Sequence, residues 1–231
     1  MPTGQRPLLV DFFCKAGGAS MGYYQAGFDV IGVDLEPQPH YPFEFHQGDF
    51  REVGARLLAE RPVVAIGSSP PCKLATDLKS FSAKHHTDLI PAAREFARAT
   101  GLPYVIENVE GAHLEDPIVL CGSMFDRLLL RHREFETNFP LMQMPHRHAE
   151  QERMSPGFPV LRYHSGKPRV VMSPVVGVYG KGQGLGVGEV ARWREFMEID
   201  WMVRDELSQA IPPYYTRWIG ARLMNVVAAS V

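Results

Sequence analysis

The chain has 231 residues, with 24 basic side chains against 26 acidic ones, and 45% of its residues are apolar. This length suits one medium-sized domain with its own hydrophobic core, and the apolar and charged fractions exclude wholesale disorder. No apolar run approaches the length of a membrane helix, and the first residues lack the pattern of a signal peptide. We therefore expect a soluble, monomeric protein that does not contact membranes.

The first half of the sequence alternates apolar runs with helical patterns. Short apolar runs that break at glycine or proline are typical of buried strands, and apolar residues three or four apart indicate helices. The predicted strands are residues 8–13, 30–34, 63–66 and 104–109, and the predicted helices are residues 19–27, 51–60 and 88–100. Strands that alternate with helices form a parallel sheet covered on both faces. We expect a doubly wound, Rossmann-like α/β fold.

The second half of the sequence is less regular. Residues 146–159 are polar and are expected to be irregular, and residues 177–188 contain six glycines. Helical periodicity returns at Glu189, and a last apolar segment follows Pro213. We therefore expect a main domain formed by residues 1–137 and 189–231, with a small, loop-rich insertion at residues 138–188.

Basic residues are concentrated in one part of the chain. Residues 127–169 contain eight Lys or Arg and four acidic residues, a net charge of +4, which leaves −6 on the remainder. A solvated face is one interpretation, and a segment that faces the phosphates of a nucleic acid is the other. The charge alone favours neither.

Reactive side chains follow several of the predicted strands. Ligands of an open parallel sheet bind at the carboxyl ends of its strands. The first strand ends in Asp11 and the small residues 16–18, and the second ends in Asp34, where a carboxylate binds ribose hydroxyls in dinucleotide sites. The next two predicted strands lead to Cys72 and to Glu107. A thiol and a carboxyl group beside a nucleoside pocket predict a catalytic set, although a single cysteine is more often structural.

Together these motifs resemble the cytosine-C5 DNA methyltransferase family, which uses S-adenosylmethionine. The matching segments, in chain order, are residues 11–18, Val33-Asp34-Leu35, Gly48-Asp49-Phe50, Pro71-Cys72, Glu107-Asn108-Val109, Arg131-His132-Arg133 and residues 207–213. The resemblance covers nearly the whole chain apart from residues 138–187. The chain departs from the family pattern at Lys15, where glycine is usual, at Lys73, where glutamine is usual, and at Gln209, where asparagine is usual.

The resemblance implies an S-adenosylmethionine site of the class I methyltransferase type. It implies that Asp34 holds the ribose, that Leu35 packs on the adenine, and that Asp49 meets the adenine amino group. The other cofactor-binding residues that it implies are Asp11, Phe13, Ala16, Gly17, Gly18, Phe50, Pro71, Gln209 and Ala210. Lys15 would place a cation near the methionine end of the cofactor, which leaves room for a carboxylated S-adenosylmethionine.

The resemblance also implies a covalent mechanism. Cys72 would add to carbon 6 of cytosine, because carbon 5 is too poor a nucleophile to attack the methyl group directly. Glu107 would hydrogen-bond N3 and the amino group of the ring, and Arg133 would hold its carbonyl oxygen. Arg131 belongs to the same Arg-x-Arg motif. The target base must be flipped out of the duplex to reach these groups.

The implied function is methylation of carbon 5 of cytosine in double-stranded DNA, as in DNA modification and restriction–modification. The expected location is the cytoplasm, at the bacterial nucleoid or in a host cell if a phage encodes the chain. A tRNA cytosine-C5 methyltransferase and a catalytically silent nucleic-acid-binding module are the alternatives. Intact Cys72, Glu107 and Arg133 argue against the silent module.

The remaining histidines and cysteines form no recognisable metal-binding pattern. His146, His148 and His164 lack the Cys or acid spacing of a metal site, so we expect surface histidines and no metal. Cys14 and Cys121 are expected to be structural. The basic residues between Lys73 and His86 fit either a lid over DNA or a solvated loop.

Overall fold

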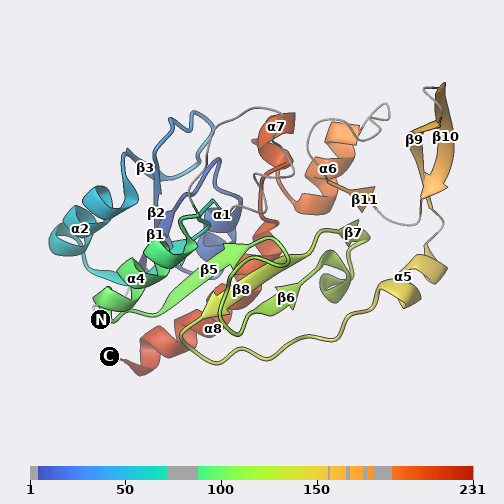
Figure 1. Cartoon of the computed structure of the whole chain (residues 1–231). Coiled ribbons are helices and arrows are strands. Elements are labelled where there is room, and N and C mark those ends of the chain that lie inside the picture. Colours follow the sequence, from blue (N-terminus) through green and yellow to red (C-terminus); the bar gives the residue numbers. More distant parts are fainter. Residues whose placement is uncertain are drawn as a thin grey trace.

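Seven strands form the central sheet of the protein, in the order β3-β2-β1-β4-β5-β8-β6 (Figure 1). The computed structural model describes residues 5–71, 88–155, 157–164, 167–173, 176–178 and 189–230. The parallel strands are β1 (Leu8–Phe12), β2 (Asp29–Asp34), β3 (Glu44–Gln47), β4 (Val63–Ser68) and β5 (Tyr104–Asn108). β8 (Arg133–Thr137) lies antiparallel between β5 and β6 (Ile118–Leu120). The doubly wound α/β prediction is confirmed.

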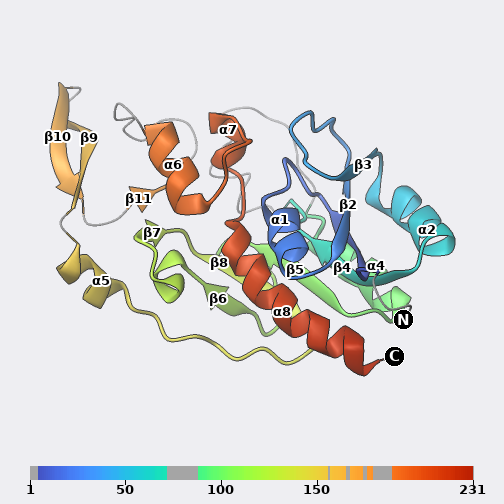
Figure 2. The same cartoon turned by 180° about the vertical axis from the view of Figure 1, so that it is seen from behind.

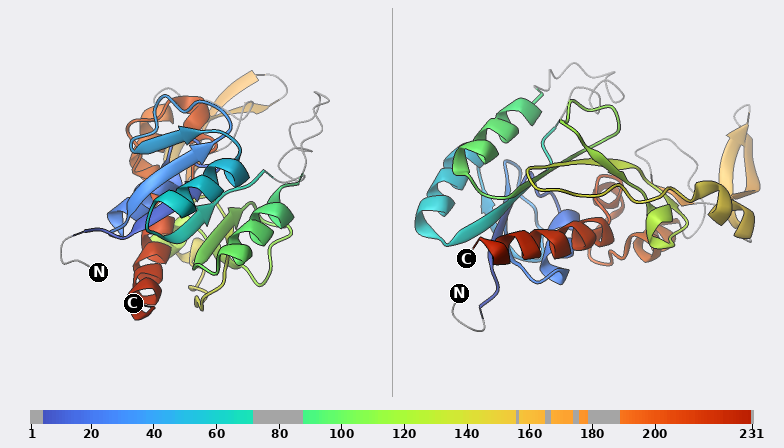
Figure 3. Two further views of the ribbon diagram at one scale, coloured as in Figure 1. Left: turned by 90° about the vertical axis from the view of Figure 1, so that its left-hand side faces the viewer. Right: turned by 90° about the horizontal axis from the view of Figure 1, so that it is seen from below.

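Helices cover both faces of the sheet. α1 (Gly18–Gln25) and α8 (Pro213–Ala229) lie on one face (Figure 2). α2 (Phe50–Glu60) and α4 (Ile90–Thr100) lie on the other (Figure 3). The side chains of β1 alternate between two core clusters, with Leu9 on the α1–α8 side and Val10 on the α2–α4 side. The strands are apolar throughout because both faces are buried.

α1 is held close against the start of α8. A Cβ atom on Gly22 would lie 2.0 Å from Oγ1 of Thr216, so only glycine permits this approach. The Thr216 hydroxyl donates a hydrogen bond to the carbonyl of Ala19, at 2.8 Å. This contact fixes the amino end of α1, which leads directly from the end of β1.

The second half of the chain holds more regular structure than its sequence predicts. Besides β8 and α8, the elements after β6 are η1 (Gly122–Phe125), β7 (Leu129–Leu130), α5 (His148–Met154), β9 (Phe158–His164), β10 (Lys167–Ser173), β11 (Val176–Gly177), α6 (Glu189–Met197) and α7 (Arg204–Leu207). The expectation that residues 146–159 are irregular is wrong for α5 and for the start of β9. β9 and β10 form a hairpin that stands apart from the sheet (Figures 1 and 3).

The chain returns to the core before the predicted insertion ends. β11 pairs with β7, and Val176 and Val178 are buried in the same cluster as α1 and α8. Phe139, near the start of the predicted insertion, belongs to that cluster as well. The segment that stands apart from the core is therefore shorter than residues 138–188. None of the helices in the described ranges has the length and apolar character needed to cross a bilayer.

Candidate active site

Asp11 lies next to the last residue of β1 and is a buried carboxyl group. Its Oδ2 accepts a 2.5 Å hydrogen bond from the hydroxyl of Ser20, which in turn accepts one from Tyr41 at 2.9 Å. Its Oδ1 is buried and has no hydrogen-bond partner among the described residues. Burial raises the pKa of Asp11 to about 7, partly opposed by the bond from Ser20. Oδ1 is therefore an acceptor that a donor on a bound molecule could satisfy.

The turn after β1 adopts an unusual backbone conformation. Phe13 and Lys15 have φ angles of 56° and 46°, in the left-handed region that favours glycine. Glycine, which is usual at this position in the family that the sequence resembles, would adopt this conformation without strain. Gly17 has a φ of 85° and a Cβ on Gly18 would lie 2.5 Å from the carbonyl oxygen of Ile211. The first and last motifs of the resemblance therefore lie against each other.

Asp34 ends β2 beside this turn. Its two carboxylate oxygens accept hydrogen bonds from the backbone N–H groups of Lys15 and Glu36, both at 3.1 Å. The Lys15 ammonium lies 3.6 Å from Asp34 and 3.2 Å from Glu36. The expectation that Lys15 serves the methionine end of a cofactor is therefore not supported, because its charge lies at the end of β2. Leu35 is 68% exposed, so its apolar surface is available to a ligand.

Asp49 and Phe50 lie at the amino end of α2. Asp49 caps this helix, because its Oδ1 accepts a 2.8 Å hydrogen bond from the backbone N–H of Arg51. Phe50 is buried, with its ring centroid 4.9 Å from that of Phe13. Local structure thus accounts for both residues, and their predicted roles in cofactor binding remain predictions.

Glu107 and Arg133 form an ion pair at the carboxyl end of β5. Arg133 Nε lies 2.9 Å from Glu107 Oε1, and both side chains are largely buried. Arg133 also donates to the carbonyl of His132 at 2.7 Å. Burial raises the pKa of Glu107, although Arg133, Arg131 and a hydrogen bond from Ser69 oppose the shift. Burial thus favours the protonated form of Glu107, and the two arginines favour its ionised form.

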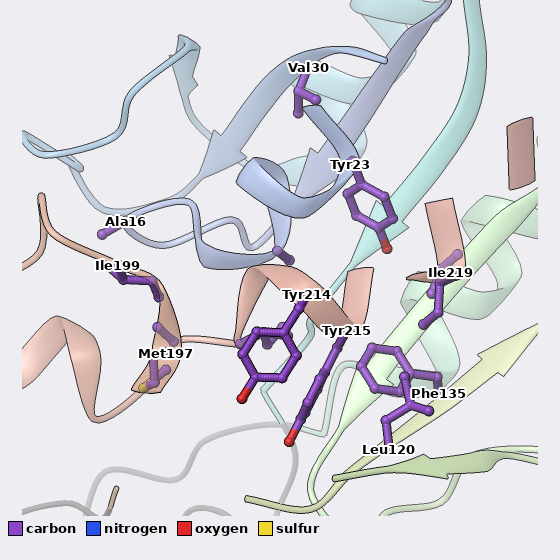
Figure 4. Packing of buried hydrophobic residues seen from close by; sticks show 14 of the residues in the cluster. Ala16, Tyr23, Val30, Leu120, Phe135, Met197, Ile199, Tyr214, Tyr215 and Ile219 are labelled. Atoms are coloured by element: carbon purple, nitrogen blue, oxygen red, sulfur yellow. The ribbon is translucent and has the colours of Figure 1, made fainter. Parts of the chain in front are cut away.

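Arg131 connects distant parts of the chain. Its guanidinium donates to the carbonyls of Val178, at 2.8 Å, and Ser208, at 3.1 Å. Its own carbonyl accepts a 2.5 Å hydrogen bond from Tyr215, whose ring lies beside Tyr214 and Phe135 (Figure 4). Burial lowers the pKa of Arg131 to about 9, so it stays charged at neutral pH. Two of its donors are thus committed to backbone groups.

The segment that leads to Cys72 is anchored at its base, whereas Cys72 itself lies outside the described residues. The side-chain amide of Asn108 donates to the carbonyl of Pro70 at 2.8 Å, which ties β5 to this turn. The backbone N–H of Leu89 donates to the carbonyl of Pro71 at 3.1 Å. Lys73–His86, the candidate lid, also lies outside the described residues.

The closing motif is only partly accessible. Ala210 is buried against Gly18. Gln209 is exposed, and its amide donates to the carbonyl of Asp205 at 3.2 Å. The carbonyl of Ala16, another predicted cofactor contact, accepts a 2.8 Å hydrogen bond from the indole of Trp201.

The basic segment contains fewer surface charges than its composition suggests. Arg127 pairs with Glu198, Arg131 is buried, and Arg133 pairs with Glu107. Arg147 is exposed next to α5 and is available to a polyanion. A shallow hollow near the amino end of β4, between α2 and α4, is lined by residues without ionisable groups and lies away from the strand ends that carry the site.

The structure gathers four side chains that the sequence does not connect. Cys121, His132, His146 and His148 offer ligand atoms that all lie within 4.8 Å of one another. Burial lowers the pKa of His132 and of His148. The sequence does not predict this cluster because its members come from separate segments, and it predicts only surface histidines and a structural cysteine here.

Comparisons with known proteins identify relatives by structure. No family model matches the sequence, and no curated protein matches it by sequence. A prophage-encoded E. coli protein assigned as a DNA modification methyltransferase superposes with a TM-score of 0.61 and 15% identity. The Dnmt2 methyltransferase of S. pombe gives 0.58 and 12%, and a mutant DNMT2 of Spodoptera frugiperda gives 0.55 and 12%. Each alignment covers 96% of this chain and 99% of the other. This chain therefore has the Rossmann-like fold of these methyltransferases.

Proposed function

We propose that the chain is an S-adenosylmethionine-dependent DNA (cytosine-5-)-methyltransferase. The observation that carries the proposal is the 2.9 Å pair of Arg133 and Glu107 at the carboxyl end of β5. Asn108, the next residue, ties down the turn that leads to Cys72. The Glu-Asn-Val and Arg-x-Arg motifs of the resemblance thus lie together at the carboxyl end of β5, next to the segment that precedes Cys72, where ligands of such folds bind. The methyltransferase neighbours support the same reaction class.

The residues at the ends of β1 and β2 fit S-adenosylmethionine. The buried Oδ1 of Asp11, which has no partner among the described residues, would accept from the ammonium group of the cofactor. Each oxygen of Asp34 accepts one backbone hydrogen bond and has a lone pair left for a ribose hydroxyl. The exposed Leu35 would cover the adenine ring. When bound, the cofactor supplies a methyl group on a positively charged sulfur.

The side chains of this protein would activate the cytosine ring. The Cys72 thiolate would add to carbon 6, while Glu107 donates its proton to N3, so that carbon 5 becomes nucleophilic. Arg133 would orient Glu107 and meet the carbonyl oxygen, where negative charge develops. After carbon 5 has taken the methyl group, its proton leaves to water. The bond between Cys72 and carbon 6 then breaks and N3 returns its proton to Glu107, which restores the aromatic ring, the thiolate and the carboxylic acid.

Arg131 would act as a positioning residue rather than a catalytic one. Its bonds to the carbonyls of Val178 and Ser208 would hold the chain on either side of the active site. The hairpin of β9 and β10, together with exposed Arg147, would contact the DNA. Because this region is small, it offers few contacts to base edges, and the target sequence should be short or loosely defined.

A methyl-transfer assay tests the proposal. Labelled S-adenosylmethionine is incubated with the protein and with either duplex DNA or tRNA. We expect label in DNA cytosine, its loss in Cys72→Ser, and a fall of about 10²- to 10⁴-fold in Glu107→Gln, because a general acid is removed. Glu52→Gln, on the exposed face of α2, is the matched control and should keep full activity.

The same assay separates the alternatives. Label in tRNA alone would move the activity to RNA. Binding of S-adenosylmethionine with no label in either nucleic acid would favour the silent module and would contradict the proposal.

A further inference from the structure

Four potential metal ligands converge at the end of the sheet next to Arg131 and Arg133. Cys121 follows β6, His132 lies between β7 and β8, His146 precedes α5, and His148 begins it (Figure 1). Nε2 of His132 lies 3.1 Å from Nε2 of both His146 and His148. Nε2 of His148 lies 3.2 Å from Sγ of Cys121. One thiol and three imidazole nitrogens thus point toward a common centre.

Hydrogen bonding does not account for all of these contacts. A neutral imidazole Nε2 carries either one proton or one lone pair in the ring plane, so it satisfies one partner. Nε2 of His132 faces two nitrogens, and Nε2 of His148 faces a nitrogen and a sulfur. At most two of the three contacts can therefore be hydrogen bonds at one time. A cation at the centre would satisfy all four ligand atoms together.

The distances and ligand types match tetrahedral zinc. Zinc binds imidazole nitrogen at about 2.0–2.1 Å and thiolate sulfur at about 2.3 Å, which places tetrahedral ligand atoms about 3.3–3.6 Å apart. Three of the six pairs of ligand atoms lie 3.1–3.2 Å apart, close to these values, and all six pairs lie within 4.8 Å. A mixed sulfur and nitrogen set excludes calcium and magnesium, which prefer oxygen. A set of four protein ligands leaves no open position, which is typical of structural zinc rather than catalytic zinc.

We propose that Cys121, His132, His146 and His148 bind one structural Zn²⁺ ion. Binding replaces the thiol proton of Cys121 with a zinc–sulfur bond and releases that proton to solvent. Each imidazole binds through its Nε2 lone pair, with its hydrogen on Nδ1. Glu110 lies 3.6 Å from Nδ1 of His132 and supplies the outer carboxylate that commonly orients such a ligand.

The position of His132 gives this ion a role in the active site. His132 is the middle residue of the Arg-x-Arg motif, and its carbonyl accepts a hydrogen bond from Arg133. The same ion would hold His146 and His148, where the chain leaves the core toward the β9–β10 hairpin. Zinc would therefore fix the backbone of the Arg-x-Arg motif and the start of the insertion to each other. The site stands independently of which nucleic acid is methylated.

Metal analysis of the purified full-length protein tests the proposal. We expect about one zinc per chain by elemental analysis and native mass spectrometry. Exposed His146 is the first target, because His146→Asn should remove a ligand without opening the core. Glu110→Gln should weaken zinc binding by about 10- to 100-fold, as loss of an outer carboxylate does, and His146→Asn should weaken it more. His113→Asn, a largely exposed histidine outside the cluster, is the matched control and should bind zinc normally.

Cobalt supplies a readout that does not depend on activity. Co²⁺ in the metal-free protein should give the visible absorption of a tetrahedral site and a thiolate-to-cobalt charge-transfer band. Cys121→Ser should lose the charge-transfer band while far-ultraviolet circular dichroism reports whether it folds. If the protein contained no zinc after it had been expressed and refolded in excess zinc, the proposal would be overturned. The proposal would also be overturned if His146→Asn bound zinc as tightly as the parent protein and the cobalt spectrum were typical of six oxygen or nitrogen ligands.

Discussion

Replacement of Asp11 by asparagine should leave the protein equally stable or less stable at acid pH and make it more stable at alkaline pH. The carboxyl group is 1% exposed, and its pKa is raised from 3.8 to about 7, chiefly by burial. Well below pH 3.8 the group is protonated in both the folded and the unfolded chain, so it carries no penalty. As the pH rises to 7 the unfolded chain loses this proton first, and stability falls. Above pH 7 the penalty is complete, at about 4 kcal/mol for a shift of about three pH units.

The asparagine variant does not titrate. Its amide oxygen can still accept from Ser20, but an N–H group in the place of Oδ1 lacks a partner, which costs about 1–3 kcal/mol. The free energy of unfolding of Asp11→Asn should therefore equal or fall below that of the parent protein at pH 4.5. At pH 8.5 it should exceed that of the parent by about 1–3 kcal/mol.

Urea unfolding of both proteins at a series of pH values measures this difference. Asp29→Asn, at an exposed carboxyl group that begins β2, serves as the control and should show no such trend. A difference between Asp11→Asn and the parent that stays constant from pH 4.5 to pH 8.5 would refute the reasoning. In that case Asp11 would be ionised in the folded protein throughout this range.

Three other changes test separate parts of the site. Asp34→Ala should weaken S-adenosylmethionine binding, measured by calorimetry, by about 1–3 kcal/mol, and an unchanged affinity would remove Asp34 from the site. Asp49→Ala should lower the free energy of unfolding by about 0.5–2 kcal/mol through loss of the α2 cap. Lys15→Gly should be more stable than Lys15→Ala by about 1 kcal/mol in urea, because only glycine relieves the left-handed backbone, and equal stability would contradict this. Arg147→Ala should weaken binding to all DNA sequences alike and lower the salt slope by about 1; an unchanged slope would show that Arg147 contacts no phosphate.

The parallel half of the fold was predictable because strands that are buried on both faces are continuous apolar runs in the sequence. The runs that became β1, β2, β4 and β5 are continuous and apolar, and glycine or proline ends the neighbouring helices. β3 was not predicted, because Glu44–Gln47 is a short, largely polar edge strand. Its register comes from pairing with β2 rather than from its own pattern.

The site was predictable only where local motifs carry it. Glu107 and Arg133 were assigned from the resemblance, and their 2.9 Å contact depends on the antiparallel pairing of β8 with β5. The histidine cluster could not be predicted from spacing, since it forms only when β6, the Arg-x-Arg motif and α5 meet. Arg131 was expected in the catalytic group, but tertiary contacts to Val178 and Ser208 occupy two of its donors.

Covalent capture of Cys72 tests the central claim most directly. A duplex that carries 5-fluorocytosine in place of cytosine, incubated with the protein and S-adenosylmethionine, presents a ring from which carbon 5 cannot lose a proton after methyl transfer. The adduct between Cys72 and carbon 6 should therefore persist through denaturation, and peptide mass spectrometry should locate the nucleotide on Cys72. Cys72→Ser should form no adduct. Methylation of DNA without any adduct, or an adduct on another residue, would contradict the account.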